Sequence, residues 1–241
     1  MSAVRPLDGR LAVVTGATRG IGRAVATRLI QDGARVVATG TGPDGQPPAG
    51  CDYRAVDFSD VGATEVFAAS LSELNPDILI NNAGINVVSD FADIATENFE
   101  RMYRVNLAAP MILCRSSIPG MRARGWGRIV NISSIWGKIA RAGRAPYAAT
   151  KFGLDGLTAA LAAEVAKHGI LANCVAPGFI DTELTRRNLG EDGIRKVVSE
   201  VPAGRLGQPE EIAGLIAWLV GPENTYISGQ NIAIDGGFTR V

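Results

Sequence analysis

Tyr147 and Lys151 are the two residues of this sequence whose types and spacing point most directly to catalysis. Residues four apart in a helix share a face, so the Lys151 ammonium can lie beside the Tyr147 phenol. A free phenol has a pKa of about 10, and a neighbouring cation lowers that pKa toward neutrality. The pair is therefore predicted to work as an acid and its activator. The alternative is an ordinary helix face, because one Tyr-x3-Lys pair also arises by chance.

Two further polar residues could join this pair. Ser134 lies thirteen residues before Tyr147 and follows the predicted strand 128–133, at the carboxyl end where open α/β sheets bind ligands. Asn106 lies inside the mostly helical pattern 96–117, where a buried amide is costly unless it has partners. Two interpretations of Asn106 remain open, namely a structural group with satisfied hydrogen bonds or a residue that bends the helix and holds a water.

A glycine-rich segment near the start of the chain indicates a nucleotide site. Glycines at 16, 20 and 22 have the spacing Gly-x3-Gly-x-Gly between an apolar run, 11–14, and a helical pattern, 21–29. In that context the backbone can approach a pyrophosphate, and the free amides of the helix start meet its charge. The spacing departs from the commoner Gly-x-Gly-x2-Gly. The alternative is a plain turn between a strand and a helix.

The end of the second predicted strand, Arg35–Thr39, bears on the choice of dinucleotide. An NAD site usually presents an acidic side chain there to the ribose hydroxyls. In this sequence Thr41 follows soon after the strand, and no carboxylate occurs until Asp44. Arg19 and Thr41 could instead bind a 2′-phosphate. NADP(H) is therefore expected, while NAD(H) stays open if Arg19 is solvated and Asp44 reaches the ribose.

Apolar runs and helical patterns alternate along the rest of the chain, which predicts a mostly parallel sheet with helices on both faces. Further strands are expected at 53–58, 77–80, 170–175 and 231–234, and helices at about 60–74, from 146 onward and at 210–220. The polar, arginine-rich segment 184–200 is typical of a substrate lid. A row of small residues indicates a subunit interface: Ala149, Gly153, Gly156 and Ala160.

Composition narrows the class of protein. At 241 residues, one α/β domain spanning 1–241 is favoured over two. Lys+Arg and Asp+Glu both number 24, so charge gives no reason to expect binding to nucleic acid or a membrane surface. No segment has the length of a spanning helix, and the first ten residues do not form a secretory signal. Three widely separated cysteines are typical of reduced thiols in a cytoplasmic protein. With one histidine and no close pair of cysteines, a zinc site is not expected.

Taken together, the motifs resemble those of the short-chain dehydrogenase/reductase family over Leu11–Gly237. The motifs that carry the resemblance are Gly16-x3-Gly20-Ile21-Gly22, Asn81-Asn82-Ala83-Gly84, Asn106, Ser134, Tyr147-x3-Lys151, and Pro177-Gly178 with Thr182. The chain looks most like ketoreductases of the 3-oxoacyl-carrier-protein reductase type. The resemblance implies a single-domain, doubly wound Rossmann fold with a seven-stranded parallel sheet, and a homotetramer.

The resemblance also implies roles. Ser134 would bind the substrate carbonyl and Tyr147 would donate the proton. Lys151 would hold the nicotinamide ribose and lower the Tyr147 pKa, and Asn106 would complete a proton relay through water. The expected cofactor-binding residues are Gly16, Thr18, Arg19, Gly20, Ile21, Gly22, Thr39, Thr41, Asp57, Phe58, Asn82, Ala83, Gly84, Tyr147, Lys151, Pro177, Gly178, Ile180 and Thr182. For Asp57, capping the helix that starts near Asp60 is the alternative.

The substrate pocket is expected to include Ser134, Trp136, Arg144, Tyr147 and Phe179. Arg144 could pair a carboxylate or phosphate of the substrate, or be a surface arginine that binds nothing. The expected substrate is a small ketone or an acyl thioester. Docking of an acyl carrier protein stays open, because arginines 122 and 124 fit such a partner while Gly125 and His168 depart from the pattern.

The leading functional hypothesis is an NADPH-dependent carbonyl reductase. An NAD-dependent secondary alcohol dehydrogenase is the second hypothesis. A non-catalytic dinucleotide-binding redox sensor is the hypothesis from another class. The intact set of Asn106, Ser134, Tyr147 and Lys151 counts against the sensor, which could dispense with it.

Overall fold

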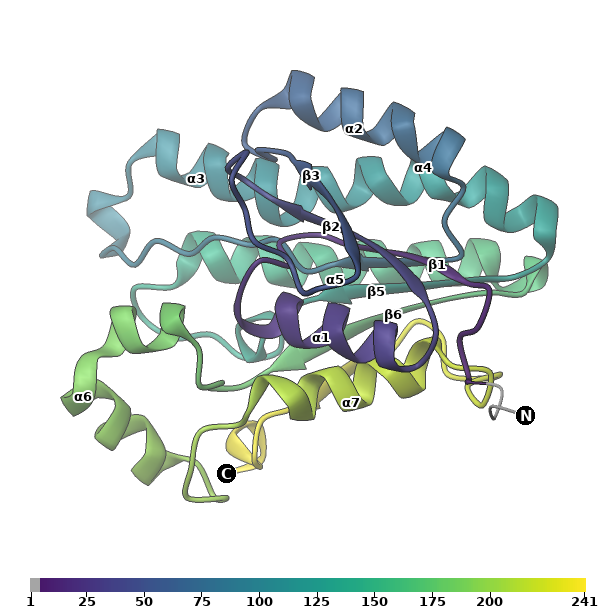
Figure 1. The fold of residues 1–241 in the computed structure, drawn as a ribbon. Helices are drawn as coiled ribbons and strands as arrows, with labels where there is room; N and C mark the ends of the chain where they lie inside the picture. The colour runs from purple at the N-terminus through teal and green to yellow at the C-terminus, as the bar shows by residue number, and fades with distance from the viewer. Residues whose placement is uncertain (1–4) are drawn as a thin grey trace.

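A parallel sheet of seven strands runs through the middle of the molecule (Figure 1). The computed structural model describes residues 5–241. Across the sheet the strand order is β3-β2-β1-β4-β5-β6-β7, with every neighbouring pair parallel. The strands are β1 (Leu11–Val14), β2 (Arg35–Gly40), β3 (Cys51–Ala55), β4 (Ile78–Asn81), β5 (Gly127–Ile132), β6 (Ile170–Pro177) and β7 (Asn231–Ile234). The predicted single-domain, doubly wound fold is confirmed.

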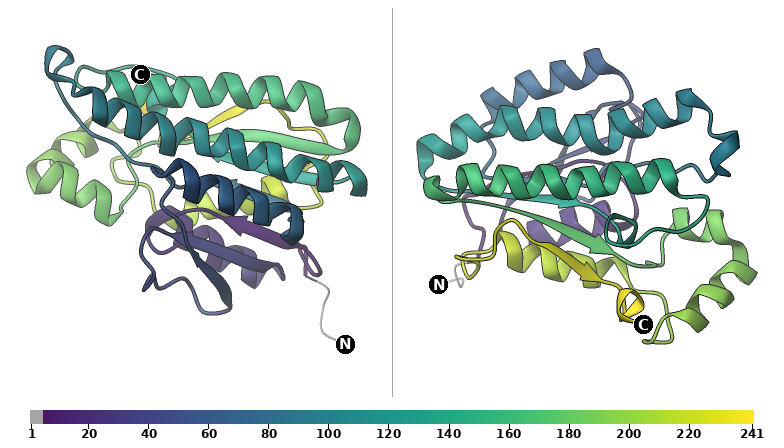
Figure 2. Two further views of the ribbon diagram at one scale, coloured as in Figure 1. Left: turned by 90° about the horizontal axis from the view of Figure 1, so that it is seen from above. Right: turned by 180° about the vertical axis from the view of Figure 1, so that it is seen from behind.

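Helices cover both faces of the sheet, as Figure 1 shows. On one face α1 (Gly20–Gln31) packs against α7 (Pro209–Val220), and on the other lie α2 (Val61–Leu74), α4 (Ala109–Arg124) and α5 (Ala145–Val165). Two helices remain, α3 (Thr96–Tyr103) and α6 (Glu183–Glu200). Helix α6 extends beyond the sheet at one end of the molecule (Figure 2).

Alternation along the strands produces two apolar cores, one on each face of the sheet. In β4, Ile78 and Ile80 belong to the core beneath α1 and α7, whereas Leu79 belongs to the core beneath α2 and α4. Successive side chains of a strand point to opposite faces. Because helices cover both faces, every residue of this strand is buried, and the strand therefore appears in the sequence as a continuous apolar run.

The strand order places the ligand crevice. Strands β1 and β4 are neighbours, but the chain leads from β1 to the β2 side of the sheet and from β4 to the β5 side. Ligands of such sheets bind at the carboxyl ends of the strands, at the point where the order reverses. The glycine turn follows β1, the segment 81–84 ends β4, and Ser134 follows β5.

Two expected elements differ from the structure, and the segment expected to be a lid forms a helix. The strand expected at 53–58 is β3, which begins at Cys51 and ends at Ala55 because its last partner, Gly40, ends β2. The pattern 96–117 is interrupted by a π-helical turn, Arg104–Ala108, between α3 and α4. The segment 184–200 is helical, with a break at Gly190 (φ 62°, ψ −179°), and Val197 is the one buried residue of α6.

Candidate active site

Helix α5 carries Tyr147 and Lys151 on one face, one turn apart. The Lys151 Nζ lies 5.5 Å from the centre of the Tyr147 ring and donates a hydrogen bond of 2.7 Å to the carbonyl oxygen of Ile132. The lysine side chain is only 3% exposed. Ser134 follows β5, and its Oγ accepts a hydrogen bond of 3.2 Å from the Trp136 amide. The three expected catalytic side chains therefore meet at the carboxyl end of β5.

The ionisation of this cluster differs from the sequence-based expectation. Burial raises the pKa of the Tyr147 phenol, and a hydrogen bond with Ser134 and the charge of Arg144 oppose that rise. Burial lowers the pKa of the Lys151 ammonium to about 8. The expected lowering of the Tyr147 pKa by Lys151 is absent among the described residues. Instead the Lys151 ammonium is held by the Ile132 carbonyl, and Arg144 is the cation that acts on the phenol.

Asn106 lies in the π-helical turn and is 1% exposed. Its Oδ1 accepts from the Ile85 amide at 2.9 Å, and its Nδ2 donates to the Ile85 carbonyl at 2.9 Å and to Thr150 Oγ1 at 3.2 Å. Thr150 in turn donates to the carbonyl of Tyr147. These bonds satisfy the buried amide, and the α-helical pattern is interrupted at the same place. Asn106 thereby fixes α5 against the loop after β4.

The glycine turn after β1 packs against the end of β4. Gly16 has a left-handed φ of +64°, and a Cβ on Gly22 would lie 2.3 Å from the Gly16 carbonyl oxygen. Asn82 Nδ2 donates to the carbonyls of Thr15 and Gly16 at 2.9 and 3.0 Å. From behind, the buried Thr39 accepts a hydrogen bond from the Gly16 amide through its Oγ1. Both glycines are therefore required by the geometry of the turn.

The start of α1 fits the pyrophosphate of a dinucleotide. Its N-cap residue, Arg19, makes no side-chain cap, and the first turn contains no acidic residue, so the first amides of the helix are not capped by a side chain and can meet an anion. Thr182, which N-caps α6, lies beside this turn, because a Cβ on Gly20 would be 3.4 Å from Thr182 Cγ2. The expected motifs at 16–22 and 182 therefore adjoin each other in the structure.

An acidic side chain at Gly40, the last residue of β2, would fit only if neighbouring side chains shifted. A Cβ at this buried glycine would lie 2.7 Å from Thr18 Cγ2 and 2.8 Å from Tyr53 Oη. Arg19 and Thr41 are both exposed at this rim. Their exposure leaves their side chains available to a 2′-phosphate.

Several other expected cofactor residues have structural partners. The Asp57 carboxylate accepts from the Ser59 amide and hydroxyl at 2.9 and 2.7 Å, which lowers its pKa, while Asp60 is the residue that caps α2. Phe58 packs in the core with its ring centre 6.0 Å from that of Phe67. Ile180 is also buried. Any cofactor contact by Phe58 or Ile180 would therefore involve the backbone.

The remaining expected cofactor residues line the same crevice. Ala83 donates its amide to Thr15 Oγ1 at 2.9 Å. A Cβ on Gly84 would lie 3.7 Å from Lys151 Nζ, so this glycine borders the catalytic lysine. Gly178, after Pro177 at the end of β6, donates to the Ile234 carbonyl at 3.0 Å.

Three aromatic rings form a cluster beside Ser134, and one of them was not expected. Trp136 meets Phe179 edge to face with ring centres 6.2 Å apart, and Phe238 meets both rings, at 6.2 and 5.2 Å. Phe238 arrives through a turn in which Asp235 accepts hydrogen bonds from the amides of Gly237 and Thr239. Asp235-Gly-Gly signals that turn in the sequence, but nothing local tells which ring Phe238 will contact.

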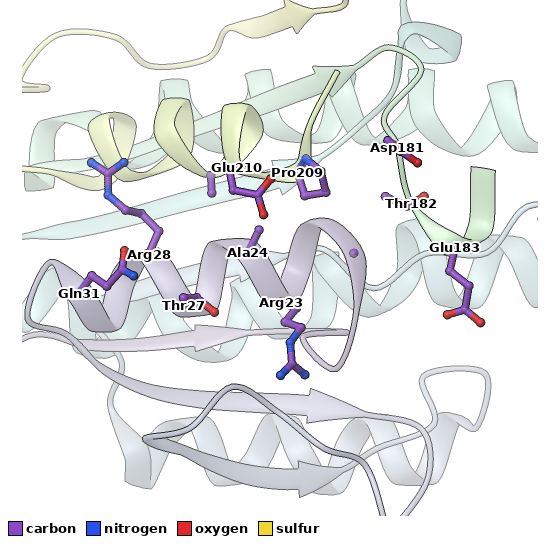
Figure 3. Close-up of a pocket in the computed structure, with 12 residues that line it drawn as sticks. Arg23, Ala24, Thr27, Arg28, Gln31, Asp181, Thr182, Glu183, Pro209 and Glu210 are labelled. Carbon is purple, nitrogen blue, oxygen red and sulfur yellow. The ribbon is translucent and has the colours of Figure 1, made fainter. Parts of the chain in front are cut away.

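A groove of about 540 Å³ runs between α1 and α7 (Figure 3). Gly20 and Thr182 line one end of it, so it adjoins the expected pyrophosphate site. Ser134, Tyr147 and Lys151 do not line it. The groove is therefore separate from the place where the chemistry is expected.

Residues 5–241 contain no helix long and apolar enough to cross a membrane. Within the same range, no three His, Cys, Asp or Glu side chains are grouped so that they could hold a metal ion.

Comparison with known proteins identifies the family of the chain. The family model described as "Enoyl-(Acyl carrier protein) reductase" matches residues 16–239. The 3-oxoacyl-[acyl-carrier-protein] reductase FabG of Vibrio harveyi is 38% identical, covering 98% of this chain and 99% of its own length. Acetoacetyl-CoA reductase of Cupriavidus necator is 39% identical, covering 95% and 97%.

A solved structure is similar over the same length. The gluconate 5-dehydrogenase from Burkholderia cenocepacia, in complex with NADP and tartrate, has a TM-score of 0.90 and 32% identity, and the match covers 98% of this chain and 97% of that one. Because the family model and the relatives match nearly the whole chain, the protein belongs to the short-chain dehydrogenase/reductase family of oxidoreductases.

Proposed function

We propose that this protein is an NADPH-dependent carbonyl reductase that converts a ketone to a secondary alcohol. The observation that carries the proposal is the convergence of Ser134, Tyr147 and Lys151 at the carboxyl end of β5, in the same crevice as the glycine turn. The ketone reductases among its relatives support the proposal.

The chain's own residues divide the reaction between them. NADPH, when bound, supplies a hydride to the carbonyl carbon. The Ser134 hydroxyl donates a hydrogen bond to the carbonyl oxygen, and Tyr147 gives that oxygen its proton. The buried Tyr147 phenol has a raised pKa, which keeps it protonated and ready to act as an acid. In the opposite direction the same group, once ionised, accepts the proton of an alcohol.

Lys151 and Asn106 prepare this proton transfer. Lys151 would hold the nicotinamide ribose hydroxyls, and Asn106 fixes the helix that carries Lys151 through Thr150. A water bound between Asn106 and Lys151 would return a proton to Tyr147 from solvent. Gly84 borders both side chains, because a Cβ there would lie 3.5 Å from Asn106 Oδ1 and 3.7 Å from Lys151 Nζ.

For the cofactor we propose NADP(H), bound with its 2′-phosphate at Arg19 and Thr41. The absence of a carboxylate between Gly40 and Pro43 supports this choice, and the side chains around Gly40 would have to shift to admit one. The related gluconate 5-dehydrogenase contains NADP, which agrees with it. NAD(H) is the alternative that the titration described below distinguishes.

The proposed substrate is a ketone whose carbonyl lies between Ser134 and Tyr147. Trp136 and Phe179 form the apolar side of its pocket, and Arg144 forms the charged side. Two substrate classes are indicated by the names of the relatives. One is an acyl thioester, and the other is a sugar acid such as gluconate, which carries a free carboxylate. The exposed helix α6, which follows Thr182 directly, is the proposed lid over this pocket.

A cytoplasmic homotetramer is the proposed form of the protein. The outer face of α5 supports it, because Gly156 has nothing within 4 Å of a built Cβ, and Ala149 and Ala160 are exposed. Exposed Phe152 and Met111 lie on α5 and α4. Such a smooth, partly apolar helix face suits close approach by a second copy of the chain.

The test combines binding and turnover. Fluorescence titration with NADPH and NADH, followed by consumption of each with a panel of ketones, should show tighter binding of NADPH and ketone-dependent oxidation. Tyr147→Phe should retain NADPH binding and lower kcat by roughly 10²–10⁴-fold. Unchanged turnover in Tyr147→Phe would show that Tyr147 is not the acid, and preference for NADH would refute the cofactor assignment.

A further inference from the structure

Three cations lie in the short segment that leads from Ser134 to α5, and the structure provides partners for two of them. Lys138 Nζ donates to the Asn231 carbonyl at 2.8 Å, and Arg141 pairs with Glu200 at 3.6 Å. Within residues 5–241, the side chain of Arg144 makes neither an ion pair nor a hydrogen bond. This guanidinium is the unpartnered charge of the segment.

Arg144 is also partly withdrawn from water. Its side chain is half-buried at the N-cap of α5, and burial lowers its pKa. A partly desolvated cation without an anionic partner is unfavourable. The usual remedy is an ion pair, which Arg141 has and Arg144 lacks. A site of this kind is suited to an anion that comes from outside the chain.

The position of Arg144 defines where that anion must lie. Arg144 precedes the proposed acid Tyr147 by three residues, and the guanidinium is close enough for its charge to act on the phenol. Because Arg144 is the N-cap residue of α5 and Tyr147 lies in the first turn of that helix, an anion bound by Arg144 would lie near the proposed acid. A remote phosphate, at the far end of a pantetheine arm, is separated from its 3-oxo group by the length of that arm and does not match this position.

We propose that Arg144 binds a carboxylate of the substrate, so that the enzyme acts on small oxo acids and the corresponding hydroxy acids. This inference rests on the proposed reductase function and specifies its substrate class. The ketone lies between Ser134 and Tyr147, the carboxylate pairs with Arg144, and the cluster of Trp136, Phe179 and Phe238 bounds the apolar part.

Matched acids and esters provide the test. Acetoacetate, 4-oxopentanoate and 5-oxohexanoate place the carboxylate at three distances from the ketone, and their methyl esters remove the charge alone. For at least one pair, wild type should show a KM for the acid roughly tenfold or more below that for the ester. Arg144→Gln should raise the KM of that acid roughly 10–100-fold, the loss expected for a charge-assisted hydrogen bond, and so remove the difference in KM between acid and ester. Any change in kcat caused by loss of the positive charge near Tyr147 should be the same for both substrates.

Two variants separate recognition of the carboxylate from other roles. Arg144→Lys should restore part of the preference for the acid, because the charge returns without the bidentate geometry. Arg141→Gln removes a neighbouring cation that already has Glu200 as its partner, and should change acid and ester alike. If Arg144→Gln lowers kcat equally for acid and ester and leaves the ratio of their KM values as in wild type, Arg144 acts only through Tyr147 and the inference is wrong.

A binding measurement keeps the inference independent of turnover. Calorimetric titration of the enzyme–NADP⁺ complex with the oxo acids and their methyl esters, which cannot exchange a hydride with NADP⁺ because both are oxidised, should show at least a tenfold preference for one acid, lost in Arg144→Gln. That preference without turnover of any ketone would leave the carboxylate site standing and refute the proposed reductase function. No preference for any acid over its ester overturns the inference, as does tighter binding of acetoacetyl-CoA than of every free acid.

Discussion

The Lys151 ammonium donates its hydrogen bond to the carbonyl oxygen of Ile132, at 2.7 Å, in a site that is almost closed to solvent. One carbonyl acceptor does not replace the hydration of an ammonium ion. Because burial removes that hydration, the pKa of Lys151 is lowered to about 8. In the protein without a bound cofactor, the Lys151 ammonium therefore lowers the free energy of unfolding.

Lys151→Met should stabilise the protein at pH 7 while removing its activity. The lysine pKa is about 8 in the folded protein and 10.5 in its ordinary state, so below pH 8 both states are charged and the folded state bears the full penalty. That penalty is on the order of 3 kcal/mol. Between pH 8 and 10.5 only the folded state loses its proton, so wild-type stability rises with pH.

Thermal unfolding of wild type and Lys151→Met across pH 6 to 10 checks this prediction. The gain in Tm of the variant should be largest below pH 8 and shrink above it. Lys167→Met, which changes the same residue type on the surface, is the control. A variant less stable than wild type at pH 7 would contradict the argument.

Gly40→Asp should weaken binding of both dinucleotides. An aspartate at this position is the acidic side chain that an NAD site presents, but its Cβ would lie 2.7 Å from Thr18 and 2.8 Å from Tyr53. The rim must shift before the carboxylate can reach a ribose. Fluorescence titration should therefore show weaker NADPH binding without a gain in NADH binding.

Gly42→Asp is the matched control for this substitution, since nothing lies within 4 Å of a Cβ at position 42. It adds the same charge near the same rim without a clash. If Gly40→Asp instead bound NADH more tightly than wild type does, the side chains of Thr18 and Tyr53 would have moved aside, and crowding at Gly40 would not determine the cofactor preference.

Phe238→Ala should change substrate selection. The Phe238 ring contacts both Trp136 and Phe179 edge to face, and each such pair contributes about 0.5–1.5 kcal/mol beyond the area that it buries. Without it the aromatic wall loosens and the pocket widens. Ratios of kcat/KM for bulky against small ketones should rise, whereas NADPH affinity should stay the same.

Removal of the exposed Tyr226 ring, as Tyr226→Ala, provides a comparison for Phe238→Ala at a site away from the cluster. Equal specificity ratios in wild type and Phe238→Ala would mean that the cluster does not bound the substrate.

Gly156→Arg should break the proposed homotetramer. Position 156 faces open space in the single chain, so an arginine side chain fits there without a clash. In a tetramer the same side chain would project into a partner helix packed against α5. Light scattering coupled to gel filtration should show a tetramer for wild type and smaller species for the variant. An unchanged mass in the variant would place the interface elsewhere, and a monomeric wild type would refute the oligomer.

The fold class and the identity of the candidate chemical groups could be predicted from the sequence alone. Alternating apolar runs specify a parallel sheet because each strand is buried on both faces, as β4 shows. The spacing of Tyr147 and Lys151 is a local property of one helix. Glycines are needed at positions 16 and 22 because of the backbone geometry of a single turn. Such short-range features are visible in a sequence because they involve neighbours in the chain.

Which charges act on which groups could not be predicted in this way, because it depends on how the elements pack. The approach of Ile132 to Lys151, of Phe238 to Trp136 and of Ile85 to Asn106 joins residues from different elements. The tertiary structure also decided that Lys138 and Arg141 have partners while Arg144 has none in the described chain. Burial and long-range pairing set the pKa of each group, and both arise only when the strands and helices pack together.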